Sequence, residues 1–143
     1  MLQFDALHKP DLSSLRFCLS QGSPIPIALL QKFEERFRTP ILEGYGLAEG
    51  TGIVSVNRVS GRWKSGSVGV PLSGLEMKIL NDRDEALTDR EIGEVVLRGE
   101  NIMAGYFKAP VGEEAIRGGW LHTGDAGYRD DDGTFFIVGR KKR

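Results

Sequence analysis

The chain has 143 residues, of which 40% are hydrophobic and 27% charged, and its formal net charge is -1 at pH 7. This composition is typical of a soluble globular domain and excludes a disordered tail. The small net charge argues against a nucleic-acid partner. One cysteine, Cys18, excludes an internal disulfide, and no apolar run approaches the roughly 20 residues of a membrane span. We expect a cytoplasmic protein without a membrane span.

The first elements along the chain are predicted to form a strand–helix–strand unit. Residues 15–20 are a short apolar strand candidate, and residues 26–37 have the apolar spacing of a helix. The apolar face of that helix consists of Leu29, Leu30, Phe33 and Phe37. Pro40 ends the helical region, and residues 41–43 open a second strand. Such a unit favours a parallel crossover connection of the α/β type.

Beyond residue 50 the pattern changes to short strands separated by turns. The predicted strands are residues 53–56, 75–80, 94–98, 127–129 and 134–138, and residues 112–117 are predicted to form one or two helical turns. Short strands with glycine-rich turns indicate a small antiparallel barrel. The predicted fold class is therefore α/β. The end of a parallel-sheet α/β subdomain (residues 1–55) is followed by a small antiparallel β-barrel subdomain (residues 56–138).

Two loops at predicted strand ends are candidates for the walls of one pocket. Residues 43–49 (EGYGLAE) place glycines on both sides of Tyr45, so that a planar ligand could approach the backbone and stack on the ring. In the same loop, Glu49 could bind Mg²⁺ or a magnesium-bound water. Residues 21–24 (QGSP) close the first strand and lead into the helix, whose N terminus attracts anions. Taken singly, each loop could equally be an ordinary turn.

The last third of the chain places a carboxylate and a guanidinium on either side of a predicted hairpin. Asp125 follows a Thr-Gly pair that we interpret as a tight turn, and Arg140 follows the last predicted strand. An aspartate can accept hydrogen bonds from both hydroxyls of a ribose, and an arginine can donate to the sugar or to a phosphate. His122 is interpreted as a packing or supporting residue. The acids at residues 130–132 are interpreted as an exposed turn and not as a metal site.

An ordered set of motifs resembles a known family: GSP at residues 22–24, EGYGLAE at 43–49, GEVVLRG at 93–99, GY at 105–106, WLHTGD at 120–125 and GRKK at 139–142. Together they resemble the adenylate-forming (AMP-binding) superfamily, and most closely its bacterial long-chain fatty-acid and acyl-CoA synthetases. The resemblance implies that a small-molecule carboxylic acid, here a fatty acid, reacts with ATP to give an acyl-adenylate. Coenzyme A then accepts the acyl group. ATP or AMP, Mg²⁺ and coenzyme A are the implied cofactors and co-substrate.

The resemblance also assigns nucleotide-binding positions: Gly22, Ser23, Pro24, Gly44, Tyr45, Gly46, Ala48, Asp125 and Arg140. The loop at residues 22–24 would border the adenine, and Tyr45 would stack on it. Asp125 would hold the ribose hydroxyls. Arg140 would lie near the ribose and phosphate.

Two further roles and two departures follow from the same comparison of motifs. Glu49 matches the magnesium-associated acid. Lys142 matches the hinge residue before a small carboxyl-terminal domain, so residues 139–143 would begin the hinge. Ala48 stands where the family usually has threonine or serine and cannot donate a hydrogen bond to phosphate. Gln21 stands where a small residue is common and would crowd the pocket edge.

The family's phosphate loop and catalytic lysine are expected outside residues 1–143, and the chain stops within a basic run. We therefore expect a central fragment of an ATP-dependent acyl-CoA synthetase that is inactive by itself and contains no catalytic residue. Two alternatives remain open. One is a non-catalytic module that forms a homo-oligomer through exposed sheet edges. The other is an adenylation enzyme with a different acceptor.

Overall fold

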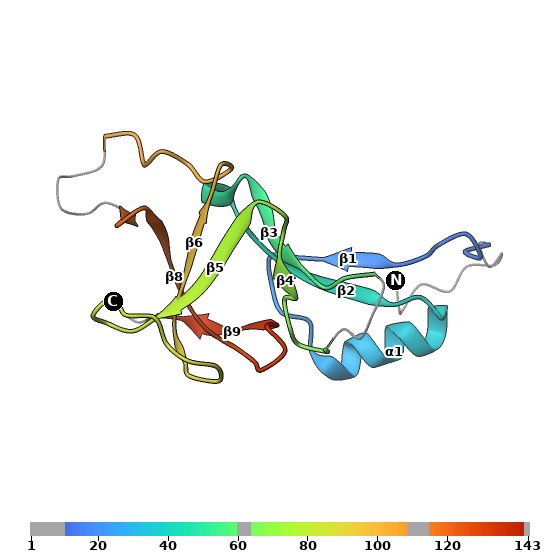
Figure 1. Ribbon diagram of the computed structural model, residues 1–143. Helices are drawn as coiled ribbons and strands as arrows, with labels where there is room; N and C mark the ends of the chain where they lie inside the picture. The colour runs from blue at the N-terminus through green and yellow to red at the C-terminus, as the bar shows by residue number, and fades with distance from the viewer. Residues whose placement is uncertain (1–10, 60–63, 109–114, 142–143) are drawn as a thin grey trace.

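The computed structural model describes residues 11–59, 64–108 and 115–141, which form two connected sheets (Figure 1). The first sheet has the strand order β1 (Cys18–Ser20), β2 (Ile41–Leu47), β3 (Gly52–Val56) and β4 (Val70–Pro71). The second has the order β5 (Leu75–Leu80), β6 (Gly93–Gly99), β8 (Trp120–Arg129) and β7 (Ile116–Arg117), and β9 (Phe135–Arg140) also pairs with β8. The predicted fold class is confirmed: an α/β unit is followed by an antiparallel half-barrel.

The α/β unit is the predicted parallel crossover. Strands β1 and β2 are parallel, and helix α1 (Ile27–Phe37) connects them on one face of the sheet (Figure 1). The helix buries Leu30 and Phe33 against Ile41 of β2, which removes its apolar stripe from water. It ends at Arg38, whose left-handed backbone lets its N–H bond back to Glu34. No helix in the described part of the chain is long and apolar enough to cross a membrane.

The second sheet is antiparallel, with β6 in its middle between β5 and β8. Val95, Val96 and Leu97 of β6 are fully buried, as expected of a central strand covered on both faces. The prediction of helical turns at residues 112–117 is wrong for its described part, because Ile116–Arg117 forms β7; residues 112–114 lie outside the described ranges. Gly118 and Gly119 both have positive φ, which suits a two-residue hairpin turn that pairs Arg117 with Trp120.

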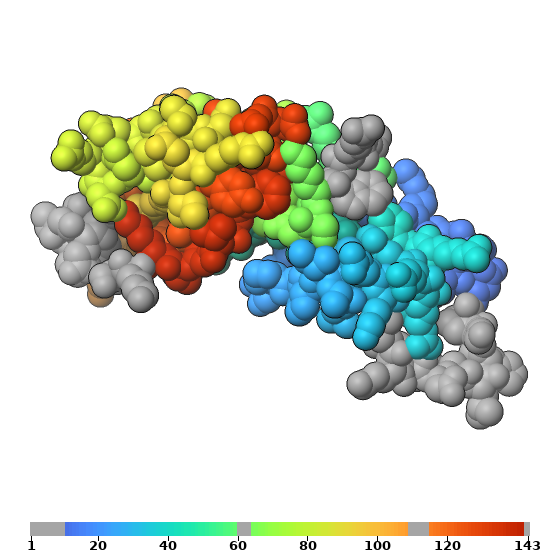
Figure 2. Space-filling view, turned by 90° about the horizontal axis from the view of Figure 1, so that it is seen from below, coloured from blue at the N-terminus to red at the C-terminus, as the bar shows by residue number. Residues whose placement is uncertain are grey.

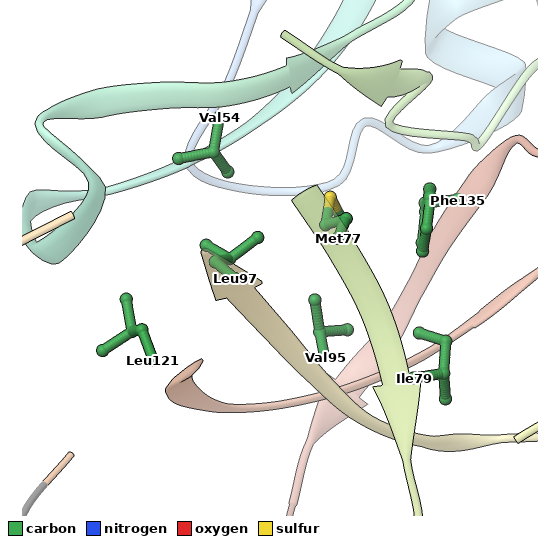
Figure 3. Close-up of a cluster of buried hydrophobic side chains, with 7 residues drawn as sticks. All are labelled: Val54, Met77, Ile79, Val95, Leu97, Leu121 and Phe135. Atoms are coloured by element: carbon green, nitrogen blue, oxygen red, sulfur yellow. The ribbon is translucent and has the colours of Figure 1, made fainter. Parts of the chain in front are cut away.

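One hydrophobic core joins the two sheets. Its buried members are Val54, Met77, Ile79, Val95, Leu97, Leu121 and Phe135. Val54 belongs to β3 of the first sheet, and Figure 3 shows its side chain facing Met77 and Leu97 of the second. A backbone bridge between Gly69 and Phe135 closes the same junction. The sheets are therefore packed on each other, and residues from both can line one cavity.

Candidate functional site

A pocket of about 420 Å³ lies between the loop that precedes α1, strand β2 and strand β9. Figure 2 shows the surface hollowed between the blue segment around the start of α1 and the red C-terminal strand. Small-molecule sites have volumes of roughly 300–1,000 Å³, so this pocket is large enough for a ligand. The predicted residues that line it are Gly22, Ser23, Pro24, Gly44, Tyr45, Gly46, Asp125 and Arg140.

Three polar side chains from three strands meet in this pocket. The Tyr45 hydroxyl on β2 donates to Asp125 Oδ2 on β8, although the two residues are 80 positions apart. Arg140 on β9 donates from Nη1 to Asp125 Oδ1 over 2.8 Å. Asp125 and Arg140 are also cross-strand partners in the β8–β9 ladder, so the backbone register fixes their proximity. Both oxygens of the Asp125 carboxylate thus face hydrogen-bond donors inside the pocket.

The backbone around Asp125 differs from the prediction. We predicted that Asp125 lies on a tight turn, but it lies within the ten-residue strand β8. Gly124 has φ of +71°, and the ladders on both sides of β8 shift register close to this point. Such bulges bend a strand and redirect a side chain without ending the strand. The bend places the Asp125 carboxylate in the pocket and leaves β8 paired on both sides.

Burial and charge set the state of these groups. Burial raises the pKa of the Tyr45 phenol, and its hydrogen bond to the Asp125 carboxylate raises the pKa further. The phenol is therefore a neutral hydrogen-bond donor. The Asp125 carboxylate raises the pKa of Arg140, whose side chain is 78% exposed. Since Arg140 is exposed, its guanidinium can turn toward a ligand without opening the core.

The glycines of β2 allow close backbone approach. A Cβ on Gly46 would lie 2.7 Å from the Gly52 carbonyl oxygen and 3.1 Å from Gln21 Oε1. Any larger residue at Gly46 would therefore push the β2–β3 turn and the Gln21 side chain apart. Gln21 does lie close to the pocket edge, as its comparison with the family suggested.

Glu49 lies beside the pocket, within η1 (Ala48–Gly50), and not in the pocket wall. The Tyr106 hydroxyl donates to its Oε1, and Met103 N–H donates to its backbone oxygen over 2.8 Å. The bond from Tyr106 is the main cause that lowers the pKa of Glu49, and the positive charge of Arg140 also contributes. Ala48, next to it, is exposed and has no side-chain donor.

A magnesium ion fits this chain only in a limited way. The described ranges contain no group of three or more His, Cys, Asp or Glu side chains that could hold a metal. Mg²⁺ is usually held by one or two carboxylates together with substrate phosphates, so one anionic glutamate is a sufficient protein ligand. Glu49 meets that requirement. Lys142, the predicted hinge residue, lies outside the described residues.

Sequence reasoning missed Glu43, which supports two walls of the pocket. Its buried carboxylate accepts hydrogen bonds from Ile25 N–H, just after the Gly22–Pro24 loop, and from Gly66 N–H. The distances are 3.4 Å and 3.0 Å, and both donors are backbone amides. Glu43 thereby fixes both loops to β2. The available signal was a charged residue directly after the apolar pair at the start of a buried strand.

Two other predictions concern residues near the hairpin. The side chain of His122 is 4% exposed, and its Nδ1 lies 3.2 Å from Glu94 Oε2, which agrees with a supporting role. The interpretation of residues 130–132 as an exposed turn is wrong for Asp130, which is only 7% exposed. Lys64 donates to the Asp130 carboxylate, and so do the backbone N–H groups of Asp132 and Thr134. Asp130 is thus a structural anchor for the β8–β9 turn.

A mixed sheet joined to an antiparallel half-barrel is the fold of this part of the adenylate-forming enzymes. The family described as AMP-binding enzyme matches residues 1–107, and the chain belongs to this family. Similar structures include an anthranilate CoA ligase, AuaEII, in complex with anthranoyl-AMP (TM-score 0.81, 36% identity, 91% of this chain and 25% of that one). The o-succinylbenzoate CoA synthetase MenE from Bacillus subtilis, solved with ATP and magnesium, is similar as well (TM-score 0.82, 32% identity, 98% and 29% covered).

The curated relatives are CoA ligases for several acids. A long-chain-fatty-acid–CoA ligase from Bacillus subtilis (strain 168) is 38% identical over 144 residues, which cover 99% of this chain and 26% of the relative. An oxalate–CoA ligase from Arabidopsis thaliana is 41% identical over 136 residues, with 93% and 26% covered. A sulfoacetate–CoA ligase from Cupriavidus necator (strain H16) is 41% identical over 133 residues, with 91% and 26% covered. The chain spans about a quarter of the length of these relatives.

Proposed function

We propose that this chain provides the adenosine-binding wall of an ATP-dependent acyl-CoA synthetase, an acid–thiol ligase. The whole protein would activate a small carboxylic acid as an acyl-adenylate and then transfer the acyl group to coenzyme A. The observation that supports this most directly is the meeting of Tyr45, Asp125 and Arg140 in one pocket. The three curated relatives described above are named as CoA ligases, which supports the choice of reaction class.

In this proposal each polar group meets the part of the nucleotide that it suits. The Tyr45 ring would stack on the adenine, bordered by the Gly22–Pro24 loop. The Asp125 carboxylate would accept hydrogen bonds from the two ribose hydroxyls. The exposed guanidinium of Arg140 would donate to the ribose or the α-phosphate and offset the charge that develops there. Mg²⁺, when bound, would neutralise phosphate charge, with Glu49 as its protein ligand.

A fatty acid is the proposed acyl substrate. Two observations favour it: several relatives are fatty-acid ligases, and the sequence of residues 15–49 resembles the bacterial long-chain enzymes. Oxalate, sulfoacetate and anthranilate are named in similar proteins, so the carboxylate is the shared feature. A cytoplasmic location belongs to the same proposal, because ATP and coenzyme A would be the co-substrates.

We further propose that residues 1–143 do not complete the reaction by themselves. By the family resemblance, the phosphate loop and the catalytic lysine would lie in other parts of a longer protein. Incubation of the purified chain with ATP, Mg²⁺, palmitate and coenzyme A should give no acyl-CoA by chromatography. Accumulation of palmitoyl-CoA would contradict this part of the proposal. It would not contradict the proposed nucleotide site.

Nucleotide binding is tested by titrating the isotope-labelled chain with AMP and following backbone amide shifts by NMR. We expect saturable shifts at Tyr45 and Asp125, and weaker binding in Asp125→Asn, because an amide accepts at one oxygen only. Asp89→Asn is the matched control, since Asp89 forms an exposed ion pair with Arg129 outside the pocket wall. Shifts confined to other residues would contradict the proposed site.

Self-association is a second candidate, and the first sheet offers one observation in its favour. In the described part of the chain β1 pairs only with β2, and Leu19 within β1 and Leu15 before it are 46% and 37% exposed. Exposed edges with apolar neighbours can pair with a second copy. Sedimentation velocity over a range of chain concentrations distinguishes a monomer from such an oligomer.

A further inference from the structure

Glu94 is a buried carboxylate of β6 that the proposed function does not use. Its side chain is 8% exposed and is absent from the pocket wall. Gly124 N–H and the Lys141 ammonium donate to it, and His122 Nδ1 lies 3.2 Å from its Oε2. Burial alone would raise the pKa of Glu94, but these hydrogen bonds outweigh it and the pKa lies below its ordinary value. The side chain is therefore an anion with a specific set of partners.

One oxygen of Glu94 holds the residue before Asp125. Oε1 accepts from Gly124 N–H over 3.1 Å, at the point where the β6–β8 register shifts between Glu94 and Val96. A bulge leaves a backbone donor without its ladder partner, and the glutamate supplies the missing acceptor. Next to it, Thr123 Oγ1 donates to the Val95 carbonyl over 2.7 Å and accepts from Asp125 N–H over 3.1 Å. The bent segment that carries Asp125 is thus fixed to β6 by side chains.

The other oxygen of Glu94 holds the residue after Arg140. Oε2 accepts from Lys141 Nζ over 3.3 Å, and Lys141 N–H donates to the Gly124 carbonyl over 2.8 Å. Lys141 also pairs with the exposed Asp82 over 2.9 Å. Glu94 therefore contacts the direct chain neighbours of both partners in the Asp125–Arg140 pair. Movement of either neighbour would change the 2.8 Å contact between Arg140 Nη1 and Asp125 Oδ1.

We propose that Glu94 is a positioning residue for nucleotide binding, which holds Asp125 and Arg140 in the geometry that receives a ribose. The proposal rests on the proposed function and names a residue that acts through Asp125 without touching the nucleotide. A purely structural role would predict that losing the Glu94 charge affects folding stability only. The positioning role predicts that a Glu94 variant loses part of the preference for a nucleotide with both ribose hydroxyls over one without them. The purely structural role predicts no change in that preference.

The test compares AMP with 2′,3′-dideoxy-AMP, which lacks the hydroxyls that Asp125 would bind. Dissociation constants are measured by NMR titration for the wild type, Glu94→Gln and Lys141→Met. In Glu94→Gln the side chain keeps its shape but has one acceptor oxygen in place of two, so an amide that accepts from Gly124 N–H turns its NH₂ group toward Lys141 and leaves the ammonium without an acceptor there. We expect AMP binding to weaken by roughly three- to tenfold, the size of one hydrogen bond, and dideoxy-AMP binding to weaken less, because it keeps only the phosphate contact of Arg140. Lys141→Met should reduce the same ratio of affinities.

The matched control is Glu76→Gln, which breaks an exposed ion pair with Arg98 in the same sheet. It should leave the AMP to dideoxy-AMP ratio at the wild-type value. Equal weakening of both nucleotides by Glu94→Gln, or no weakening of either, would overturn the positioning role. A wild type that fails to prefer AMP would instead overturn the proposed function.

A measurement without nucleotide tests the positioning role of Glu94 even if the wild type does not prefer AMP. Carbon-13 shifts of the Asp125 carboxyl group and nitrogen shifts of the Arg140 guanidinium report their mutual contact directly. Both should change in Glu94→Gln and in Lys141→Met, and neither should change in Glu76→Gln. Since Lys141 is on the surface, its variant provides a folded protein even if Glu94→Gln is unstable. Wild-type shifts in both variants would contradict the positioning role.

Discussion

The Tyr45 hydroxyl links the first sheet to the second, because its hydrogen-bond acceptor is Asp125 on β8. Burial and this bond both favour the neutral phenol, so the folded pKa lies above the ordinary value of 10.0. The contribution to stability is complete below the unfolded pKa and is lost as the pH rises above about 10, since only the unfolded phenol ionises there.

Tyr45→Phe removes the ionisable group and should flatten this alkaline loss. Urea unfolding of the wild type at pH 8, 9.5 and 11 should show a falling free energy of unfolding. The variant should start about 1 kcal/mol lower at pH 8, because it lacks the hydrogen bond to Asp125, and fall less steeply. An identical pH dependence in both proteins would show that the Tyr45 phenol ionises in the folded chain as readily as in the unfolded one.

Glu49 owes its lowered pKa mainly to one neighbour, the Tyr106 hydroxyl. Tyr106→Phe should therefore raise the pKa of Glu49 toward its ordinary value of 4.5. A carbon-13 NMR titration of the Glu49 carboxyl group between pH 2.5 and 7 measures this change. The same titration of Asp125→Asn is a comparison, because that variant keeps the Tyr106 hydroxyl that donates to Glu49. An unchanged Glu49 titration in Tyr106→Phe would assign the lowered pKa to other groups, such as Arg140.

The residues in the pocket could be predicted in part, and the limit is physical. Tyr45, Asp125 and Arg140 belong to short motifs with glycine neighbours, which mark places of close approach in the sequence. Glu43 and Glu94 also have glycine neighbours, Gly44 and Gly93, but this pattern does not show what their carboxylates contact. Their importance comes from backbone amides brought to them by other strands, and a buried carboxylate cannot be distinguished from an exposed one until those donors are placed.

Among the elements, long periodic segments agree with their predictions and short ones depend on their partners. The helix, predicted over residues 26–37, forms over Ile27–Phe37 because its apolar stripe is sufficient to define it. Strand β8 begins at Trp120, seven residues before the predicted start at residue 127, because ladders on both sides continue through the bulge near Gly124. Pairing partners, which a single sequence does not show, decide such boundaries.

Gly69, in the segment before β4, is a position where the backbone requires glycine. It is buried, has φ of +76°, and a Cβ there would lie 2.1 Å from the Val56 carbonyl group. The Gly69 carbonyl accepts from Phe135 N–H over 2.8 Å, which joins β9 to the segment before β4. Gly69→Ala therefore forces this segment away from β3, and with it the Gly69 carbonyl that accepts from β9.

Gly66→Ala is the matched control, because Gly66 has φ of +79° with no atom near its added Cβ. We expect Gly66→Ala to cost about 1 kcal/mol, from the left-handed backbone alone. Gly69→Ala should cost at least about 2 kcal/mol more, from the backbone clash. Chemical denaturation of both variants measures the difference. Equal losses would mean that the junction relaxes around the new methyl group without strain.

At the scale of the whole molecule, the two sheets are coupled through shared apolar contacts and through the pocket. Val54 is fully buried in a cluster whose other buried members all belong to strands of the second sheet. The Tyr45–Asp125 bond crosses the same junction. The division at residues 55 and 56 remains a prediction about chain organisation, and these contacts predict that both sides of it unfold together.

Leu97→Ala tests that coupling from the second sheet. Leu97 is fully buried in the shared core, so its truncation should lower the free energy of unfolding by about 2–5 kcal/mol. Native-state hydrogen exchange then shows which amides lose protection in the variant. If the sheets form one cooperative unit, amide protection should fall by the same free energy at Leu42 of β2 and at Val95 of β6. Leu29→Ala, at a 47% exposed position of α1, should change neither. Protection lost at Val95 and retained at Leu42 would show that the sheets unfold separately, and that the half of the pocket with Asp125 and Arg140 can open while the half with Tyr45 stays folded.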